Sequence, residues 1–319
     1  MNTYSIVSII ICITIVFIFF FTGTGKTYTP IERPAIETKN LDLYLSESEG
    51  QYDDIKPDVE KKIIWFDEPN TKTEISIIYL HGFSASRQEV SPLTENIAKL
   101  LSANVFLTRL TGHGRSGEAM GSLSVEELLA DTVEAFDIGK KIGNRVLVIG
   151  MSTGSTLATW LAVKAQSEQL AGLVLLSPNY GLVDPKSNWL LKPGARYWLP
   201  LVEGRTYHFS PDNELQAKYW SWKYPTVALI PMMVLVNYVT ELPLKSITAP
   251  VLVLYSDTDK IVDIKKTRKI YDRIGSGIKE IGVIKDTQGS QHHVLAGDVL
   301  SPATTLEVES RIISFVKNL

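Results

Sequence analysis

From residue 62 onward, short apolar runs alternate with amphipathic stretches of helical length. The apolar runs are rich in valine, isoleucine and leucine, which is typical of buried parallel strands. They predict strands at residues 63–66, 74–80, 104–108, 145–149, 173–176, 250–255 and 281–284. Helices are predicted after Ser91-Pro92, from Ser124 to about Ile142, and over 305–319. Strands separated by helices predict an α/β fold with one mostly parallel sheet covered on both faces.

A different pattern begins the chain. Residues 4–21 are almost continuously apolar, and about 18 residues of helix span ~27 Å, close to the hydrocarbon thickness of a bilayer. A cleaved signal peptide fits less well, because no lysine or arginine precedes Tyr4 and no small-residue cleavage site follows Phe21. We therefore expect an uncleaved, single-pass membrane anchor over residues 1–22. Residues 23–60, which are polar and contain Pro30 and Pro34, are expected to form a tether.

Residues 178–248 interrupt the alternation of strands and helices. This stretch holds most of the chain's tryptophans and several tyrosines. A long insertion between two sheet strands is usually a lid or a binding loop. We expect an aromatic-rich cap, whose aromatic side chains form its own small core or line an apolar cleft above the sheet.

Composition and charge narrow the classes of function. The chain has 319 residues, of which 45% are hydrophobic and 21% charged, with a net charge of −3, as in an ordinary globular protein. No basic stripe is present, so nucleic acid is not expected as a partner. The single cysteine, Cys12, lies in the apolar N-terminus, and no cluster of His, Asp or Glu has metal-ligand spacing. We expect no metal and no cofactor.

The run Gly150-Met151-Ser152-Thr153-Gly154 stands between a predicted strand and a predicted helix. A Gly-x-Ser-x-Gly run at this place is typical of a sharp turn that exposes a nucleophilic serine. The glycines on both sides of Ser152 spare a strained turn from Cβ clashes. A small-residue turn without chemistry is the alternative, because the motif is short.

A serine hydroxyl needs a base, and the base needs an orienting acid. The five histidines of the chain are His81, His113, His208, His292 and His293. The predicted strand over 250–255 runs into Ser256-Asp257-Thr258-Asp259, and His292-His293 follows the last predicted strand. The chain order is therefore serine, aspartate, histidine, as in α/β-hydrolases.

Four motifs in this order resemble α/β-hydrolases of the carboxylesterase and monoacylglycerol-lipase group, which is related to the S33 serine aminopeptidases. They are Leu80-His81-Gly82-Phe83, Gly112-His113-Gly114, the Ser152 turn, and the late Asp/His pair. The resemblance covers residues 62–319. It implies the α/β-hydrolase fold for residues 61–319, with the cap inserted at about 178–248.

The resemblance also implies roles for individual residues. Ser152 matches the nucleophile, and Asp259 occupies the acid position of a Gly-x-x-Asp pattern, in which Ser256 replaces the glycine and leaves Asp257 as an alternative. His293 precedes a hydrophobic residue, as the family's base does, with His292 as the alternative. The backbone N–H groups of Phe83 and Met151 are expected to form the oxyanion hole. His81 and His113 are expected to brace their loops.

These expectations combine into a membrane-anchored serine hydrolase that cleaves carboxylic esters through an acyl-enzyme. The aromatic cap and the adjoining membrane favour a small ester or lipid substrate with an apolar acyl chain. The same triad also suits a thioesterase, an amidase or an acyltransferase. A non-catalytic, tethered binding module is a further alternative, although such proteins usually lose a triad member. The charges near the anchor leave its orientation open, and analogy with secreted esterases slightly favours an extracytoplasmic body.

Overall fold

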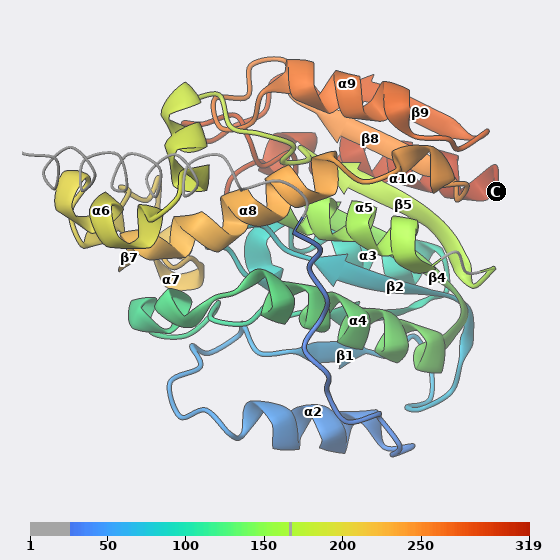
Figure 1. Ribbon diagram of the computed structural model, residues 1–319. Coiled ribbons are helices and arrows are strands. Elements are labelled where there is room, and N and C mark those ends of the chain that lie inside the picture. Colours follow the sequence, from blue (N-terminus) through green and yellow to red (C-terminus); the bar gives the residue numbers. More distant parts are fainter. Residues whose placement is uncertain (1–25, 166–167) are drawn as a thin grey trace, which may run out of the picture.

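The computed structural model describes residues 26–165 and 168–319. Its centre is a seven-stranded sheet with the order β1-β3-β2-β4-β5-β8-β9, seen in Figure 1. The strands are β1 (Lys62–Ile64), β2 (Thr73–Leu80), β3 (Asn104–Leu107), β4 (Gly143–Met151), β5 (Leu170–Leu176), β8 (Val251–Tyr255) and β9 (Lys279–Val283). Strand β1 pairs antiparallel with β3, and the other neighbours pair in parallel. The mostly parallel sheet predicted from the apolar runs is confirmed.

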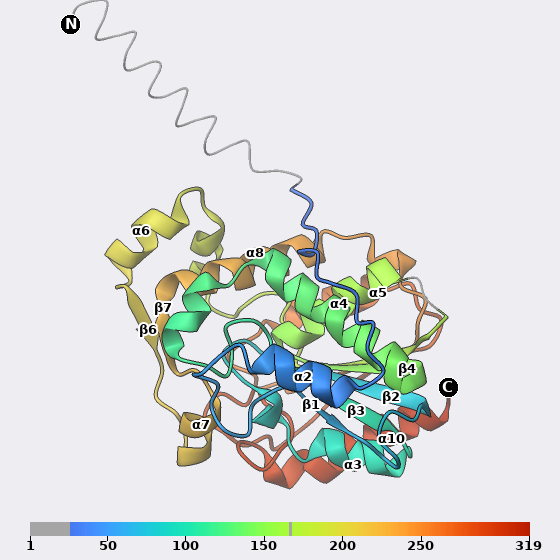
Figure 2. The same ribbon diagram turned by 90° about the horizontal axis from the view of Figure 1, so that it is seen from below.

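Helices cover both faces of the sheet (Figure 2). On one face lie α4 (Val125–Ile142), α5 (Thr153–Ala165) and α9 (Ile264–Arg273), and on the other lie α3 (Leu93–Leu100) and α10 (Thr305–Lys317). Successive strand side chains point to opposite faces. In β2, Ile78 and Leu80 accordingly pack with the first group, whereas Ile77 and Tyr79 pack with the second.

Local sequence signals set the ends of some elements. The Ser124 hydroxyl accepts the N–H of Glu127 at 3.1 Å and caps α4, as the capping-box spacing predicts. Helix α4 ends at Ile142, where the pattern of apolar residues also placed its end. The length and position of this helix could therefore be read from the sequence.

The N-terminal segment differs from the expected tether. Residues 26–40, which we call the strap, run along α4 and lead into α2 (Leu41–Glu49), as Figure 2 shows. Arg33 of the strap forms ion pairs with Glu127, Asp131 and Glu134 of α4, at 2.8–2.9 Å. The polar composition of residues 23–60 suggested a linker, but the charge of Arg33 is paired with carboxylates of α4.

The predicted anchor, residues 1–22, lies outside the described residues. Within residues 26–165 and 168–319, no helix combines the length and the apolar character needed to cross a membrane.

The segment between β5 and β8 forms a cap beside the carboxyl ends of the strands (Figure 1). Its elements are η3 (Pro185–Leu191), α6 (Ala195–Val202), β6 (Thr206–His208), α7 (Glu214–Tyr219), β7 (Lys223–Pro225), η4 (Thr226–Ala228), α8 (Leu229–Thr240) and η5 (Leu244–Ser246). Strands β6 and β7 pair antiparallel. Trp220 and Tyr224 are buried, whereas Trp189 and Tyr197 are exposed. The aromatic side chains of the insertion therefore do not form one common core.

Candidate active site

Ser152 lies at the junction between β4 and α5, in the left-handed backbone region with φ +53°. A Cβ atom at Gly154 would collide with the Leu80 carbonyl, and one at Gly150 would lie 2.6 Å from the Gly154 backbone. Both glycines are therefore required by close backbone approach. The Ser152 N–H donates to the Leu176 carbonyl at 2.9 Å and fixes the turn to the end of β5. This is the strained turn that the motif predicts.

Asp259 and His293 meet beside this turn. His293 Nδ1 lies 2.7 Å from Asp259 Oδ2, and the Asp259 side chain is fully buried. The other carboxylate oxygen, Oδ1, accepts the N–H groups of Ile261 and Val262 at 2.7 and 3.0 Å. With both oxygens engaged, Asp259 is held in one orientation and fixes the imidazole in turn.

His293 belongs to the β9–η6 loop (residues 284–301), which ends at η6 (Pro302–Thr304). The Ser177 hydroxyl, directly after β5, donates to the His293 carbonyl at 2.7 Å. The Ser152 N–H donates to the carbonyl of Leu176, the residue directly before Ser177. The serine and the histidine are therefore anchored to adjacent residues at the end of one strand. No hydrogen bond joins the Ser152 hydroxyl to the His293 ring among the described residues, and in serine hydrolases that bond often tightens only when substrate binds.

The two alternatives left open by the sequence occupy other positions. Asp257 is exposed. Nδ1 of His292 lies 2.7 Å from the Thr287 carbonyl oxygen rather than from a carboxylate. Of these four side chains, the structure brings Asp259 and His293 together.

The β2–η1 loop (residues 81–86) leads from β2 to η1 (Arg87–Glu89) and contains Phe83. The Phe83 N–H makes no hydrogen bond to another described residue, so it is available as a donor. The Phe83 ring contacts the rings of His113 and Tyr224 edge-on, with centroids 5.6 Å away in each case. This residue therefore lies between the loop after β2 and the cap.

The geometry argues against Met151 as the second donor. Met151 ends β4 and is paired with Leu176 in the sheet. Because neighbouring amides of a strand point to opposite sides and the Ser152 N–H points to β5, the Met151 N–H is directed toward β2. Thr153 follows Ser152 and begins α5, and its N–H makes no hydrogen bond to a described residue. The general rule for this fold, which takes the residue after the nucleophile, points to Thr153 in the sequence itself.

His81 and His113 lie behind these loops with their rings 5.1 Å apart. His81 Nε2 accepts the Leu110 N–H at 3.1 Å, and Nδ1 lies 2.9 Å from the Gly82 carbonyl, so the partners suit a neutral ring. Burial, and then the nearby His113, hold the pKa of His81 well below its usual value. Burial lowers the pKa of His113 to about 4. Two neutral, fully buried imidazoles fit the expected bracing role.

In contrast to the pKa values of His81 and His113, the pKa of His293 is raised. Burial by itself would lower the pKa of its imidazole. The charge and hydrogen bond of Asp259, together with the charge of Glu89, more than offset burial and raise the pKa above its usual value. A histidine that is stabilised in its protonated form is suited to accept a proton from a neighbouring hydroxyl.

Phe83 packs against two clusters of apolar side chains. One lies in the cap and contains Leu199, Met232 and Met233. The other joins Tyr224 of the cap to Met120, which lies before α4. Phe83 thus brings the β2–η1 loop into contact with apolar side chains of α6, α8 and β7.

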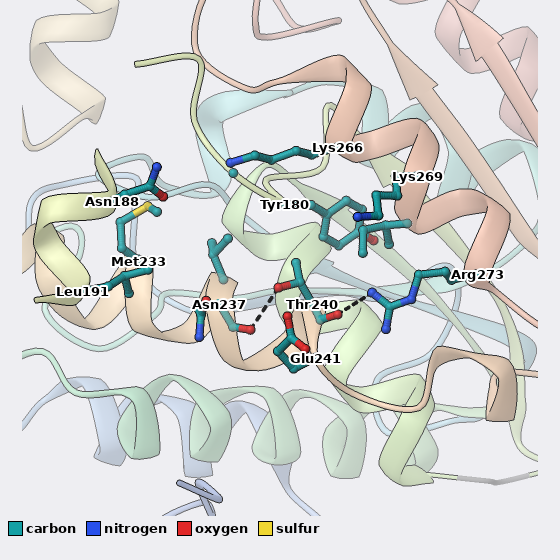
Figure 3. A pocket seen from close by; sticks show the side chains of 13 residues that line it. Tyr180, Asn188, Leu191, Met233, Asn237, Thr240, Glu241, Lys266, Lys269 and Arg273 are labelled. Atoms are coloured by element: carbon teal, nitrogen blue, oxygen red, sulfur yellow. Dashed lines mark hydrogen bonds between the residues drawn. The ribbon is translucent and has the colours of Figure 1, made fainter. Parts of the chain in front are cut away.

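A separate cavity of about 210 Å³ lies between α8 and α9 (Figure 3). Its lining mixes apolar, polar and charged residues: Tyr180, Gly181, Asn188, Leu191, Met233, Val236, Asn237, Thr240, Glu241, Lys266, Lys269, Ile270 and Arg273. In Figure 3 the Arg273 guanidinium points to the Thr240 carbonyl, to which it donates a hydrogen bond. None of the three predicted catalytic side chains lines this cavity, so it is not the apolar cleft expected above the sheet.

Within the part of the chain that the structure describes, no group of three or more His, Cys, Asp or Glu side chains is placed to hold a metal ion.

Known proteins resemble this chain in sequence and in fold. The sequence profile of the family described as serine aminopeptidase, S33, matches residues 71–296. A thermostable monoacylglycerol lipase from Bacillus sp. (strain H-257) is 28% identical over 230 residues, which are 72% of this chain and 86% of the relative.

Solved structures share the fold. A structure described under the lipolytic enzymes LipS and LipT superimposes with a TM-score of 0.68 and 21% identity, over 83% of this chain and all (100%) of the other. The monoacylglycerol lipase of Paleococcus ferrophilus has a TM-score of 0.60 and 15% identity, over 81% of this chain and 98% of the other. A soluble variant of Saccharomyces cerevisiae monoglyceride lipase has the same TM-score of 0.60 and 15% identity, over 81% and 90%. The chain therefore belongs to the serine aminopeptidase S33 family and has the α/β-hydrolase fold.

Proposed function

We propose that this protein hydrolyses carboxylic esters with an apolar acyl chain through a Ser152–His293–Asp259 acyl-enzyme mechanism. The observation that carries the proposal is the 2.7 Å contact between His293 and the buried Asp259, formed beside a serine in a left-handed turn. Membership of a hydrolase family supports it, and so does the similarity to a monoacylglycerol lipase.

In the proposed reaction, the Ser152 hydroxyl attacks the ester carbonyl while His293 Nε2 takes its proton. Asp259 keeps the Nδ1 proton on the opposite side of the ring and stabilises the imidazolium. The oxyanion accepts the free N–H groups of Phe83 and Thr153, and each such donor lowers the barrier by about 3 kcal/mol. His293 then protonates the leaving alcohol. A water molecule, activated by the same histidine, releases the acid and restores Ser152.

The expected acyl preference follows from the surroundings of Phe83. Its neighbours in the cap are leucine, methionine and aromatic side chains, which favour an alkyl chain over a charged group. Monoglycerides and lysophospholipids are suitable substrates of this kind. We further propose that the cap at about 178–248 belongs functionally to the hydrolase domain over 61–319.

A series of chromogenic esters from acetyl to palmitoyl tests this substrate class. We expect kcat/KM to rise from acetyl to a medium chain by about tenfold or more, since each buried methylene contributes about 0.8 kcal/mol. A steep fall beyond acetyl would contradict the apolar acyl site. Matched thioesters and anilides should be cleaved more slowly, and a preference for either would favour the thioesterase or amidase alternatives.

We also propose that residues 1–22 anchor the enzyme to a membrane, because the apolar run over 4–21 has the length of a single span. Fractionation of cells that express the full chain or a variant lacking residues 1–22 tests this. The full chain should sediment with membranes in high salt, and the truncated chain should not. Equal release of both would contradict the anchor, and protease accessibility in intact cells reports which side carries the body.

A further inference from the structure

Glu89 is a carboxyl group enclosed in the protein next to the candidate site. It is the last residue of η1, which follows the β2–η1 loop directly, and only 3% of it is exposed. An ionisable group at such a depth is costly unless it is hydrogen-bonded or paired. Its partners therefore indicate why a glutamate stands here.

Two donors bind the same oxygen of Glu89. The Tyr79 hydroxyl donates to Oε2 at 2.9 Å, and the Gly82 N–H donates to it at 2.7 Å. A Cβ at position 82 would lie 2.7 Å from Oε1, so any side chain there would displace the Glu89 carboxylate. Glu89 thus holds the backbone immediately before Phe83, whose N–H is a proposed oxyanion donor.

No lysine or arginine pairs with Glu89 among the described residues. Arg87 of the same short helix turns to Glu60 instead, with contacts of 2.9 and 3.0 Å. Glu95 of α3 is bound to the hydroxyls of Ser91 and Thr94. Among the described residues that act electrostatically on Glu89, His293 is the one that can carry a positive charge.

The loop that carries His293 also docks on the end of η1. The Asp298 N–H donates to the Ser91 carbonyl at 2.9 Å. A Cβ at Gly297 would lie 2.7 Å from the Val90 Cα and 3.0 Å from the Glu89 carbonyl oxygen. One short segment, residues 89–91, therefore contacts both the β2–η1 loop and the β9–η6 loop.

We propose that Glu89 is a positioning residue that serves both halves of the candidate machinery. Its carboxylate holds the Gly82 amide, and thereby the Phe83 donor, while its negative charge adds to that of Asp259 in stabilising the protonated form of His293. The inference rests on the proposed function. No bond is made or broken at Glu89, and the proton of Ser152 still moves to His293.

The titration of the surrounding groups agrees with this arrangement. Burial raises the pKa of Glu89 to about 7, while the bonds from Gly82 and Tyr79 and the charge of His293 act in the opposite direction. Burial, then Glu89 and then Glu95, raise the pKa of Tyr79, so its hydroxyl stays a donor. The charged forms of Glu89 and His293 accordingly stabilise each other: His293 acts to lower the pKa of Glu89, and Glu89 acts to raise the pKa of His293.

The pH dependence of kcat/KM in Glu89→Gln tests the proposal in the full-length protein with a chromogenic butyrate ester. The variant keeps the size of the side chain and removes its charge. We expect the acidic limb of the profile to shift by about 0.5–1 unit to lower pH, because the protonated form of His293 loses one stabilising charge. We also expect kcat near pH 8 to fall about tenfold, with KM changed less than about twofold.

Tyr79→Phe is the matched control, because it removes the other donor to Oε2 and leaves the charge. Its acidic limb should not move down. A residue that only stabilised the loop would lower kcat in both variants without shifting either limb, and that result would overturn the proposal. If Glu89→Gln does not fold, as judged by its thermal transition, Glu89→Asp decides. It should keep the wild-type acidic limb, and a downward shift would contradict the proposal.

The outcome is separable from the proposed function. If the wild type cleaves no ester and Ser152 is inert, the proposed function fails. If the wild type is active and the limb does not move in Glu89→Gln, only the role of Glu89 fails.

Discussion

The strap–α4 contact and the candidate active site are both rich in buried polar groups, but they differ in how completely these groups are paired. In the strap contact, Arg33 binds three carboxylates, and Glu134 also accepts the ammonium of Lys61 and the hydroxyl of Tyr44. At the candidate active site, both carboxylate oxygens of Asp259 have partners. The Ser152 hydroxyl and the N–H groups of Phe83 and Thr153, by contrast, make no hydrogen bond to a described residue.

This difference separates a structural network from a site. Buried polar groups are normally hydrogen-bonded, so a network in which the charges are paired needs nothing further. The proposed nucleophile and its two proposed oxyanion donors, which make no hydrogen bond to a described residue, are free to bind a substrate carbonyl. We therefore expect substitutions at the candidate active site to lower activity and substitutions at the strap to lower stability.

The largest effect is expected for Ser152→Ala. Without the nucleophile, kcat/KM for an ester should fall by a factor on the order of 10⁴ to 10⁶. The thermal transition should stay within about 2 °C of the wild type, because the hydroxyl makes no hydrogen bond to a described residue. Substantial remaining hydrolysis in the purified variant would place the nucleophile elsewhere.

Asp259→Asn should be next, with kcat lowered about 10³- to 10⁴-fold. The amide oxygen can still accept the N–H groups of Ile261 and Val262, but the amide nitrogen would face His293 Nδ1 and favour the wrong tautomer. Asp257→Asn is the matched control. It changes an exposed carboxylate two residues away, so its kcat should stay within about twofold of the wild type. A larger loss in the Asp257 variant would reverse the assignment.

At the strap, Arg33→Ala should lower the free energy of unfolding by about 2–4 kcal/mol, because Asp131 and Glu134 lose a buried partner. Denaturant unfolding measures this change. The kcat of the variant, measured where it is still folded, should stay within about twofold of the wild-type value. A large loss of kcat with unchanged stability would make the strap part of the site and remove the contrast between the two regions.

The smallest expected effect concerns the pH dependence of stability at Glu89. The pKa of this group is about 7 in the folded protein and near 4.3 in an unfolded chain, so the folded state holds the proton more tightly. Its contribution to stability is full below about pH 4 and is lost as the pH rises through 7. Relative to Glu89→Gln, the wild type should therefore lose about 1–3 kcal/mol between pH 5 and pH 8. Parallel curves for the two proteins would contradict a raised pKa.

Much of the fold could be predicted from local patterns. Apolar runs mark the parallel strands, and the Ser124 cap marks the start of α4. The glycines around Ser152 are explained by contacts within one turn and its neighbouring strand. The pairing of Asp259 with His293 followed from chain order and the family resemblance rather than from geometry.

Features that depend on distant partners could not be predicted. Arg33 stands in a polar, proline-containing segment, and its partners are 94 to 101 residues away in the sequence. Glu89 lies in the polar run Arg87-Gln88-Glu89, which suggests a surface. It is buried because the β2–η1 and β9–η6 loops meet around it. The Thr153 donor is different, because its position directly after the serine was visible in the sequence.

Covalent labelling of the full chain by a fluorophosphonate tests the central claim most directly. Intact-mass measurement followed by peptide mapping should find one adduct per chain, located on Ser152. Labelling should be slowed by at least about a hundredfold in Asp259→Asn and absent in Ser152→Ala. An unlabelled wild type, or an adduct on another residue, would contradict the assignment of Ser152 as the nucleophile.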